Sequence, residues 1–292
     1  MTRLSDHRPI PSARDKPLAA LMLAGSLIAL AASIFGLYAW PLKFLFGLSS
    51  LFCLVCVIYS ALRMAALLYS YQEPQLPNIP QDQLPVFSIL LPLYREANIV
   101  DKLAVNIRRI DYPADKLDII FICEPHDLET IDAVKKISNT PGQIFITDGT
   151  SPHTKPHALN QALRIAKGEI ITVYDAEDRP HPAQIHQAAQ ALSADTNLGV
   201  VQAPLTYYNS QQNWLTRQFT LEYAALFLVW LPFLYSLDLP FPLGGTSNHI
   251  RRKALEDIDT VGWDSWNVTE DADISFRMAA AGWKLGLSLI HI

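Results

Sequence analysis

Two long runs without a charged residue constrain this chain more than any other feature of its sequence. Residues 18–40 and 44–62 contain no Asp, Glu, Lys or Arg, and each run is long enough to cross a hydrocarbon core of about 30 Å as one helix. Pro41 and Lys43 lie between the runs and favour a turn. The sequence therefore predicts a transmembrane helical hairpin within residues 18–71.

The charges around these runs predict the orientation of the hairpin. Residues 1–17 form a basic leader, and Arg63 follows the second run, whereas the short loop between the runs has a single lysine. Positive charge favours the cytoplasmic side, so both ends of the hairpin are expected there. The first run is too long for a signal peptide, and no small-residue cleavage site follows it. We expect a multi-pass protein of the inner (plasma) membrane whose N-terminus and remaining residues are cytoplasmic.

The composition excludes one class of partner and one kind of chemistry. The formal net charge is -5, and no stripe of Lys and Arg interleaved with aromatic residues occurs, so nucleic acid is not an expected partner. Cys53 and Cys56 lie inside the second apolar run, where a redox role is not expected. Cys123 ends a strand-like run and is expected to be buried.

Strand-like and helix-like segments alternate after a stiff, proline-rich linker at residues 72–85. This alternation predicts an α/β fold, a mostly parallel sheet flanked by helices, over residues 86–286. Neither a GxGxxG motif nor a P-loop occurs, so side chains and a metal would have to hold any nucleotide. Strands are expected at 86–91, 119–123, 144–147, 170–174 and 200–208, with helices at 96–110, 127–138 and 157–167.

Polar residues follow each of the first four predicted strands. Ligands of open α/β sheets bind outside the carboxyl ends of the strands, so these residues are expected to form a site for a metal and a charged substrate. The alternative is that Asp178 is only the N-cap of a following helix. The strand ends carry, in chain order, Glu96, Glu124, Lys155 and the three carboxylates Asp175, Glu177 and Asp178.

A third apolar segment, residues 214–239, is rich in Leu, Phe and Trp. Its uncharged core of about 15 residues is short for a membrane span, and Pro232 is expected to break it. We interpret this segment as an interfacial helix on the membrane surface. A helix buried in the protein core is an equal alternative.

Two later segments carry further polar groups. Gly244, Gly245 and Thr246 are predicted to form a glycine turn that opens a helix, where free backbone N–H groups and nearby arginines would suit an anion. Thr269 is predicted to cap another helix with an acidic first turn. A helix cap does not require the additional carboxylates of Asp271 and Asp273.

In this order, the motifs resemble those of the family 2 glycosyltransferases, in particular the membrane-embedded, cellulose-synthase-like exopolysaccharide branch. The resemblance covers residues 86–286 and implies a GT-A-like domain preceded by the membrane hairpin. It rests on a Pro-Leu-Tyr-Arg-Glu exit from the first strand, Lys155 ahead of Ala158-Leu-Asn, an Asp-x-Asp-like element at Asp175, a Gly-Gly-Thr turn at Gly244 and a Thr-Glu-Asp element at Thr269.

The resemblance implies a membrane-bound inverting transferase of the hexosyltransferase type. It would move a sugar from a nucleotide-diphosphate sugar to a glycan or lipid-linked acceptor. A UDP-sugar is the expected nucleotide sugar. The nucleotide sugar would contact Glu96, Glu124, Lys155 and Asp175. The alternatives are a noncatalytic nucleotide-sugar-binding membrane partner subunit and a metal-dependent nucleotidyltransferase.

Further roles follow from the same resemblance. A divalent cation, Mg²⁺ or Mn²⁺, would neutralise the leaving diphosphate. Glu177 is favoured as the ligand of this cation because its side chain is longer, and Asp178 is the alternative ligand. Asp271 matches the general base, which takes the proton of the acceptor hydroxyl in a single displacement. The residues expected near the acceptor or the diphosphate are Gly245, Thr246, Glu270 and Trp266.

One motif of the family is not present. The Gln-x-x-Arg-Trp element would fall beyond Ile292, and residues 287–292 are predicted to be a non-native tail. We therefore expect a natural protein that is longer at its C-terminus. A chain that ends here would lack part of its acceptor site and is expected to be inactive.

Overall fold

The chain divides into two compact units, residues 1–70 and 71–292. The computed structural model describes residues 16–69, 76–137, 141–258 and 262–288. Most of the predicted basic leader and of the predicted tail, residues 1–15 and 289–292, lies outside the described residues.

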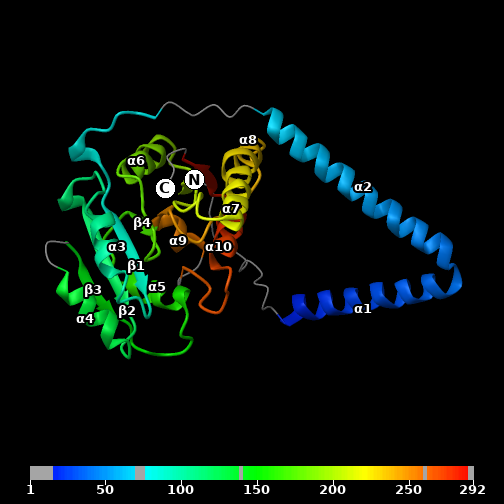
Figure 1. The fold of residues 1–292 in the computed structure, drawn as a ribbon, viewed down its shortest axis with the longest axis horizontal. Coiled ribbons are helices and arrows are strands. Elements are labelled where there is room, and N and C mark those ends of the chain that lie inside the picture. The colour runs from blue at the N-terminus through cyan, green and yellow to red at the C-terminus, as the bar shows by residue number, and fades with distance from the viewer. Residues whose placement is uncertain (1–15, 70–75, 138–140, 259–261, 289–292) are drawn as a thin grey trace, which may run out of the picture. The chain divides into compact units, whose positions relative to one another are not determined.

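The first unit is a pair of apolar helices joined by a sharp turn (Figure 1). Helix α1 spans Lys16–Ala39 and helix α2 spans Pro41–Leu68, with Trp40 alone between them. The turn lies where it was predicted, because proline suits the first turn of a helix and not its interior. Gly36 permits the close approach at this turn, since a Cβ atom there would overlap the Phe44 ring.

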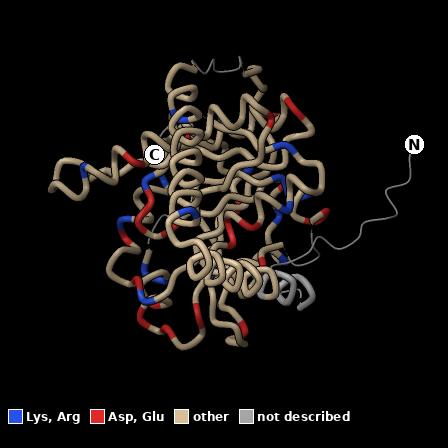
Figure 2. The backbone as a smooth tube through the Cα atoms, turned by 90° about the vertical axis from the view of Figure 1, so that its right-hand side faces the viewer, with Lys and Arg blue, Asp and Glu red and all other residues tan. Residues whose placement is uncertain are grey.

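The described side chains of these two helices are mostly apolar and exposed. Figure 2 shows the coils of the two helices with few charged positions. Within the described part of the chain, Pro41–Leu68 and Trp214–Ser236 are the helical segments long and apolar enough to cross a membrane, by length and composition alone. The described apolar part of α1, Ala24–Ala39, is shorter than such a span.

The second unit is built on a mixed, mostly parallel sheet of seven strands in the order β3-β2-β1-β4-β6-β5-β7. Strand β1 lies between β2 and β4, and all pairings among β1 to β4 are parallel, which confirms the predicted α/β fold. Only β6 is antiparallel to its neighbours in the described sheet. The strands are β1 Phe87–Leu93, β2 Leu117–Cys123, β3 Gln143–Ile146, β4 Ile170–Val173, β5 Leu198–Gln202, β6 Asn248–Arg251 and β7 Lys284–Leu287.

Helices cover both faces of this sheet (Figure 1). Successive residues of β1 point to opposite faces, so Ile89 packs with the helices of one face and Leu90 with those of the other. Cys123 is buried, as predicted. One face carries α3 Val100–Ile107, α4 Leu128–Lys136 and α6 Gln184–Ala194, and the other carries α5 Lys155–Leu163, α9 Arg252–Ile258 and α10 Glu270–Ala280.

The end of the predicted linker is fastened to this unit. Two short 3-10 helices, Gln81–Gln83 and Ala114–Lys116, supply residues of the attachment. The Lys116 ammonium donates to the carbonyl oxygens of Asp82 and Leu84, at 2.6 and 2.7 Å. The chain therefore enters β1 from a fixed direction.

The glycine turn leads into a strand and not into a helix as predicted. Strand β6 follows it, and helix α9 begins only at Arg252. The two arginines are used inside the fold, because Arg251 donates to the Leu192 carbonyl at 2.6 Å and Arg252 to the Ala166 carbonyl at 2.7 Å. The prediction of a helix start at this turn is therefore wrong, and the two arginine side chains donate to carbonyl groups inside the fold.

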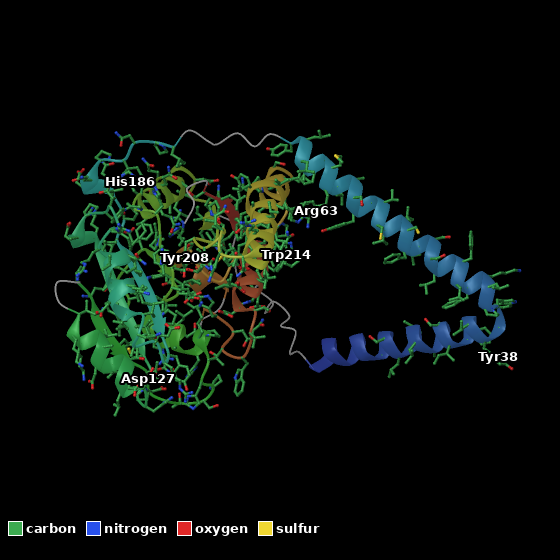
Figure 3. All side chains as sticks on the ribbon, viewed as in Figure 1. Tyr38, Arg63, Asp127, His186, Tyr208 and Trp214 are labelled. Carbon is green, nitrogen blue, oxygen red and sulfur yellow. The ribbon has the colours of Figure 1, made fainter. Side chains whose placement is uncertain are left out.

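The apolar segment after residue 213 is one continuous helical stretch. Pro232 does not end it as predicted, because it lies in the first turn of the last part, directly after a wider π-helical turn. Phe227 and Leu231 are buried, whereas Trp214 near the start of the stretch is 71% exposed (Figure 3). The three parts are α7 Trp214–Ala225, the π-helix η3 Leu226–Trp230 and α8 Leu231–Ser236.

Candidate active site

The exit from β1 is held in place by the start of α4. Arg95 has a positive φ of 58°, and its N–H donates to the carboxylate of Asp127 at 2.5 Å. The N–H of Glu96 donates to the Thr130 hydroxyl at 3.0 Å. Burial by itself raises the pKa of Asp127, but hydrogen bonds from Arg95 and Thr130 bring the pKa below its usual value. Asp127, which the sequence shows only as a polar residue near a strand end, thus holds the backbone at Arg95, and Thr130 holds it at Glu96.

A cavity of about 550 Å³ opens at the carboxyl ends of β1, β2 and β4. Its walls include four side chains that were predicted to form one site from four strand ends. These are Glu96, Glu124, Lys155 and Asp175. The rings of Tyr94, His126 and His153 also line the cavity, with centroids 5.8 Å apart between Tyr94 and His126 and 6.1 Å apart between the two histidines.

The carboxylates of Glu96 and Glu124 differ in their surroundings. Glu124 accepts a hydrogen bond from the Thr147 hydroxyl at 2.8 Å. The Oε2 atom of Glu96 is buried and has no hydrogen-bond partner among the described residues. Burial, followed by the charges of Glu177 and Asp175, raises the pKa of Glu96 to about 7. Glu96, which lines the cavity, therefore retains one carboxylate oxygen without a hydrogen-bond donor among the described residues.

Lys155 joins the acidic turn, residues 175–178, to the glycine turn. It is the first residue of α5, which Thr154 caps through the N–H of His157. The Lys155 ammonium donates to the Asp175 carboxylate at 2.5 Å and to the Gly245 carbonyl at 3.0 Å. A residue predicted only as a nucleotide contact thus holds two other predicted site residues together.

Glu177 and Asp178 are adjacent in sequence but lie in different environments. Asp178 accepts a hydrogen bond from the Asp175 N–H at 2.7 Å and another from the Thr246 hydroxyl. Burial is the main cause that raises its pKa to about 6. Glu177 is exposed. Asp178 is not the N-cap of the next helix, since α6 begins at Gln184 without a side-chain cap.

Helix α10 begins with several carboxylates, and one of them lies next to the glycine turn. Thr269 does not cap this helix with its side chain, because its hydroxyl donates to Asn267 at 3.0 Å. A Cβ atom on Gly245 would lie 3.6 Å from Oδ2 of Asp271, which places Asp271 against that turn. Burial raises the pKa of Glu270, and the charge of Lys155 opposes this rise.

Asn160 ties the loop before α10 to α5. Its side-chain amide donates to the Trp263 carbonyl at 2.7 Å and its carbonyl accepts the Trp263 N–H at 3.0 Å. Trp263 is buried, and Trp266 is 56% exposed. Helix α5 therefore positions both halves of the site, with Lys155 as its first residue and Asn160 farther along the same helix.

The comparisons decide the family once this geometry is known. A family model described as "Glycosyltransferase like family 2" matches residues 85–287. The chain belongs to this family. The prediction of a glycosyltransferase is confirmed.

Curated relatives carry the same class of name. This family 2 glycosyltransferase is 25% identical over 216 residues to "Probable glycosyltransferase YdaM" of Bacillus subtilis, covering 71% of the chain and 51% of that protein. It is 25% identical to "Beta-monoglucosyldiacylglycerol synthase" of Trichormus variabilis, covering 70% and 43%, and 27% identical to "Cellulose synthase 1 catalytic subunit [UDP-forming]" of Komagataeibacter xylinus, covering 81% and 31%. The chain spans about half or less of the length of these relatives.

Solved structures support the GT-A-like fold of the second unit. The mannosyltransferase PcManGT from Pyrobaculum calidifontis, in complex with GDP-Man and Mn²⁺, is 21% identical with a TM-score of 0.63, covering 80% of this chain and 62% of that chain. TarS of S. aureus in complex with UDP-GlcNAc is 14% identical with a TM-score of 0.51, covering 71% and 58%. At these identities the likeness concerns the fold alone.

A second cavity of about 230 Å³ lies on the other side of the acidic turn of this glycosyltransferase. Asp175 lines both cavities. The guanidinium carbon of Arg179 lies 3.8 Å from the centre of the Tyr208 ring, which Figure 3 labels. Sequence reasoning did not single out Arg179, and the only signal was its position directly after the acidic motif.

The donor atoms at the acidic turn fit a hard divalent cation. The described residues contain no ready cluster of three or more His, Cys, Asp or Glu side chains that would hold a metal by themselves. Mg²⁺ in transferases is commonly bound by one or two carboxylates together with phosphates of the substrate. Asp175 and the exposed Glu177 supply such a partial set, which agrees with a cation that binds together with a diphosphate.

Proposed function

We propose that this chain is a membrane-bound inverting glycosyltransferase of the hexosyltransferase type. It moves a sugar from a nucleotide-diphosphate sugar, a UDP-sugar by preference, to a glycan or lipid-linked acceptor in polysaccharide or glycolipid synthesis. Residues 86–286 form the catalytic domain. The relatives named for cellulose and glucosyldiacylglycerol synthesis support acceptors of these two kinds.

One observation carries this proposal. The Lys155 ammonium bridges the Asp175 carboxylate and the Gly245 carbonyl, and Gly245 lies against Asp271. The acidic strand end and the base candidate, roughly a hundred residues apart in sequence, are thereby neighbours at one edge of the sheet. Inverting transfer needs this neighbourhood, because the leaving group and the base must act on the same carbon from opposite faces.

The proton and electron balance of the reaction assigns the roles. The acceptor oxygen forms a bond to the anomeric carbon and loses its proton to the carboxylate of Asp271. The bond between that carbon and the diphosphate oxygen breaks, and the nucleoside diphosphate leaves with the electron pair. A single displacement inverts the anomeric configuration, so no second nucleophile is required.

The larger cavity is assigned to the nucleotide. Glu96 and Glu124 face the base or ribose, and Lys155 and Asp175 lie next to the diphosphate. Asp175 and Glu177 would hold a Mg²⁺ or Mn²⁺ ion, which supplies positive charge to the leaving diphosphate when bound. Glu177 is preferred over Asp178 because both hydrogen bonds of the Asp178 carboxylate go into the protein.

The glycine turn and α10 are assigned to the diphosphate and the acceptor. Gly245 and Thr246 separate the acidic turn from Asp271, and Glu270 lies within the electrostatic reach of Lys155. The exposed indole of Trp266 offers a flat apolar surface to a sugar ring. These residues stand where an acceptor would approach.

The membrane-bound state is supported by the first unit. Helices α1 and α2 expose apolar side chains that water would not favour, and α2 is long enough to span a bilayer. We place the N-terminus and the catalytic domain in the cytoplasm of an inner-membrane protein, on the charges around the hairpin. The exposed apolar side chains of Trp214–Ser236 support contact of this segment with the membrane surface.

A donor screen tests the proposed function. Detergent-solubilised protein is incubated with UDP-, GDP- and other nucleotide sugars in the presence of Mg²⁺ or Mn²⁺, and nucleoside diphosphate release is measured. Release from one donor, with an inverted product linkage, supports the proposal. Release of pyrophosphate would indicate a nucleotidyltransferase, and binding of the donor without turnover in the full-length protein would indicate a noncatalytic subunit.

A further inference from the structure

The ion pair between Lys155 and Asp175 is the central contact of the larger cavity. The ammonium lies 2.5 Å from the carboxylate, and the two side chains are 29% and 34% exposed. The second contact of the ammonium, at 3.0 Å, is the carbonyl oxygen of Gly245. A half-buried ion pair with such contacts is screened less by water and salt than a surface pair.

Lys155 faces acids from several elements. It is the only lysine or arginine among the described residues that line the larger cavity. Burial raises the pKa of Glu96 at the end of β1 and of Glu270 at the start of α10, and the charge of Lys155 opposes the rise in both. Asp175, Glu177, Asp127 and Asp271 add negative charge to the same surroundings.

We propose that the Lys155 ammonium is the resident cation of the nucleotide-sugar site. It neutralises Asp175 while no nucleotide sugar is bound, and it competes with a divalent cation for that carboxylate. This inference rests on the proposed function and deepens it by predicting an order of binding. The cation alone binds weakly, because its binding must displace the ammonium from Asp175. A diphosphate offers the ammonium another anionic partner, and the flexible stem of lysine allows the exchange.

A purely structural role of Lys155 predicts the opposite behaviour. If the side chain only clamps the acidic turn to the glycine turn, its removal loosens both turns and weakens every ligand of the site. Competition predicts that removal of the ammonium strengthens the binding of a cation in the absence of nucleotide. The two hypotheses therefore differ in the direction of one measurable change.

Manganese binding without nucleotide tests the proposal. Mn²⁺ is titrated into purified wild type, Lys155→Met, Lys155→Arg and Asp175→Asn, and the free Mn²⁺ is measured by electron paramagnetic resonance. We expect Lys155→Met to bind Mn²⁺ at least about tenfold more tightly than wild type, Lys155→Arg to bind no more tightly than wild type, and Asp175→Asn to lose binding. The matched control is Lys253→Met, which removes the exposed Lys253–Asp257 pair of α9 and should leave Mn²⁺ affinity unchanged.

Equal or weaker Mn²⁺ affinity in a folded Lys155→Met protein overturns the inference. If that variant does not fold, Lys155→Gln is used, since it removes the charge and retains a hydrogen-bond donor. A wild type that binds Mn²⁺ equally well with and without nucleoside diphosphate also overturns it. Failure of the inference with intact turnover leaves the proposed function standing, whereas a wild type without donor binding or turnover rejects the proposed function itself.

Discussion

The hydroxyl of Thr246 donates a hydrogen bond to the carboxylate of Asp178, across 68 residues of chain. The same hydroxyl contacts the Val173 carbonyl at 3.2 Å, and the same carboxylate accepts the N–H of Asp175 at 2.7 Å. The acidic turn and the glycine turn are therefore one connected structure. A change at Thr246 is transmitted to the turn that carries Asp175 and Glu177.

Replacement of Thr246 by Val should destabilise the protein. The change keeps the shape but leaves a largely buried carboxylate without one of its donors, which costs about 1–3 kcal/mol. The free energy of unfolding in urea measures the loss. Thr220→Val is the control, because its hydroxyl returns only to the Thr216 carbonyl of its own helix, at 2.8 Å. Equal effects in the two variants would show that Asp178 does not depend on Thr246.

The choice of metal ligand between Glu177 and Asp178 predicts unequal metal dependence. Glu177→Gln should raise the Mn²⁺ concentration for half-maximal turnover by about tenfold or more, because a carboxylate ligand is worth on the order of 1.4 kcal/mol or more. Asp178→Asn should change it much less, since its oxygen can still accept both internal hydrogen bonds. The assignment is wrong if Asp178→Asn has the larger effect on metal dependence and both variants fold.

Replacement of Asp271 by Asn should remove the general base with little change in donor binding. Turnover is expected to fall by roughly 10²–10⁴-fold, as for loss of other positioned bases, while the Kd of the donor changes little. The amide oxygen can still accept the Ala272 N–H, which Asp271 accepts at 2.8 Å. Wild-type turnover in this variant would reject the assignment.

The matched control for Asp271 lies two residues later. Asp273 is bound to Arg277 at 2.7 Å, on the same helix. Asp273→Asn should reduce stability slightly and leave the chemical step intact. If both variants lose turnover equally, the effect comes from the helix and not from a base at Asp271.

His249 predicts a loss of stability in acid. It is fully buried beside Thr172, and burial lowers its pKa to about 3. Between this pKa and the unfolded value of about 6.5, the unfolded chain binds a proton at this histidine that the folded chain does not. The contribution of neutral His249 to the free energy of unfolding is therefore fully present above about pH 6.5. It is lost as the pH falls toward the pKa of the folded state, by roughly 1.4 kcal/mol per pH unit. His249→Gln should show a shallower loss between pH 7 and 5 in urea unfolding. The exposed His181→Gln should match wild type, and equal slopes in all three proteins would contradict the prediction.

The sequence alone determined the elements that depend on local pattern. Ile170–Val173 and Phe87–Leu93 are apolar runs that can only be buried, and the alternation with helices places their carboxyl ends at one edge. For this reason Glu96, Glu124, Lys155 and Asp175 could be predicted as neighbours from their positions after the strands. The same local reasoning placed the turn of the hairpin at Pro41.

Contacts between distant segments were decided only by the tertiary structure. The sequence could rank Glu177 and Asp178 only by side-chain length, whereas in the folded chain the Thr246 hydroxyl donates to Asp178. Strand β6 was predicted as a helix start because its antiparallel partners, β4 and β5, lie far away in sequence.

The acidic turn at Asp175 shows most clearly which features follow from the sequence and which follow from the tertiary structure. Its residues and its place at a strand end follow from the sequence, because strand formation depends on neighbouring residues. Its partners, Lys155 and the glycine turn, follow from the way helices pack on a sheet, which brings together residues that no short stretch of sequence relates. The chemistry of the turn and the presence of Lys155 at the same sheet edge were therefore predictable, and the direct contacts of Lys155 with Asp175 and Gly245 were not.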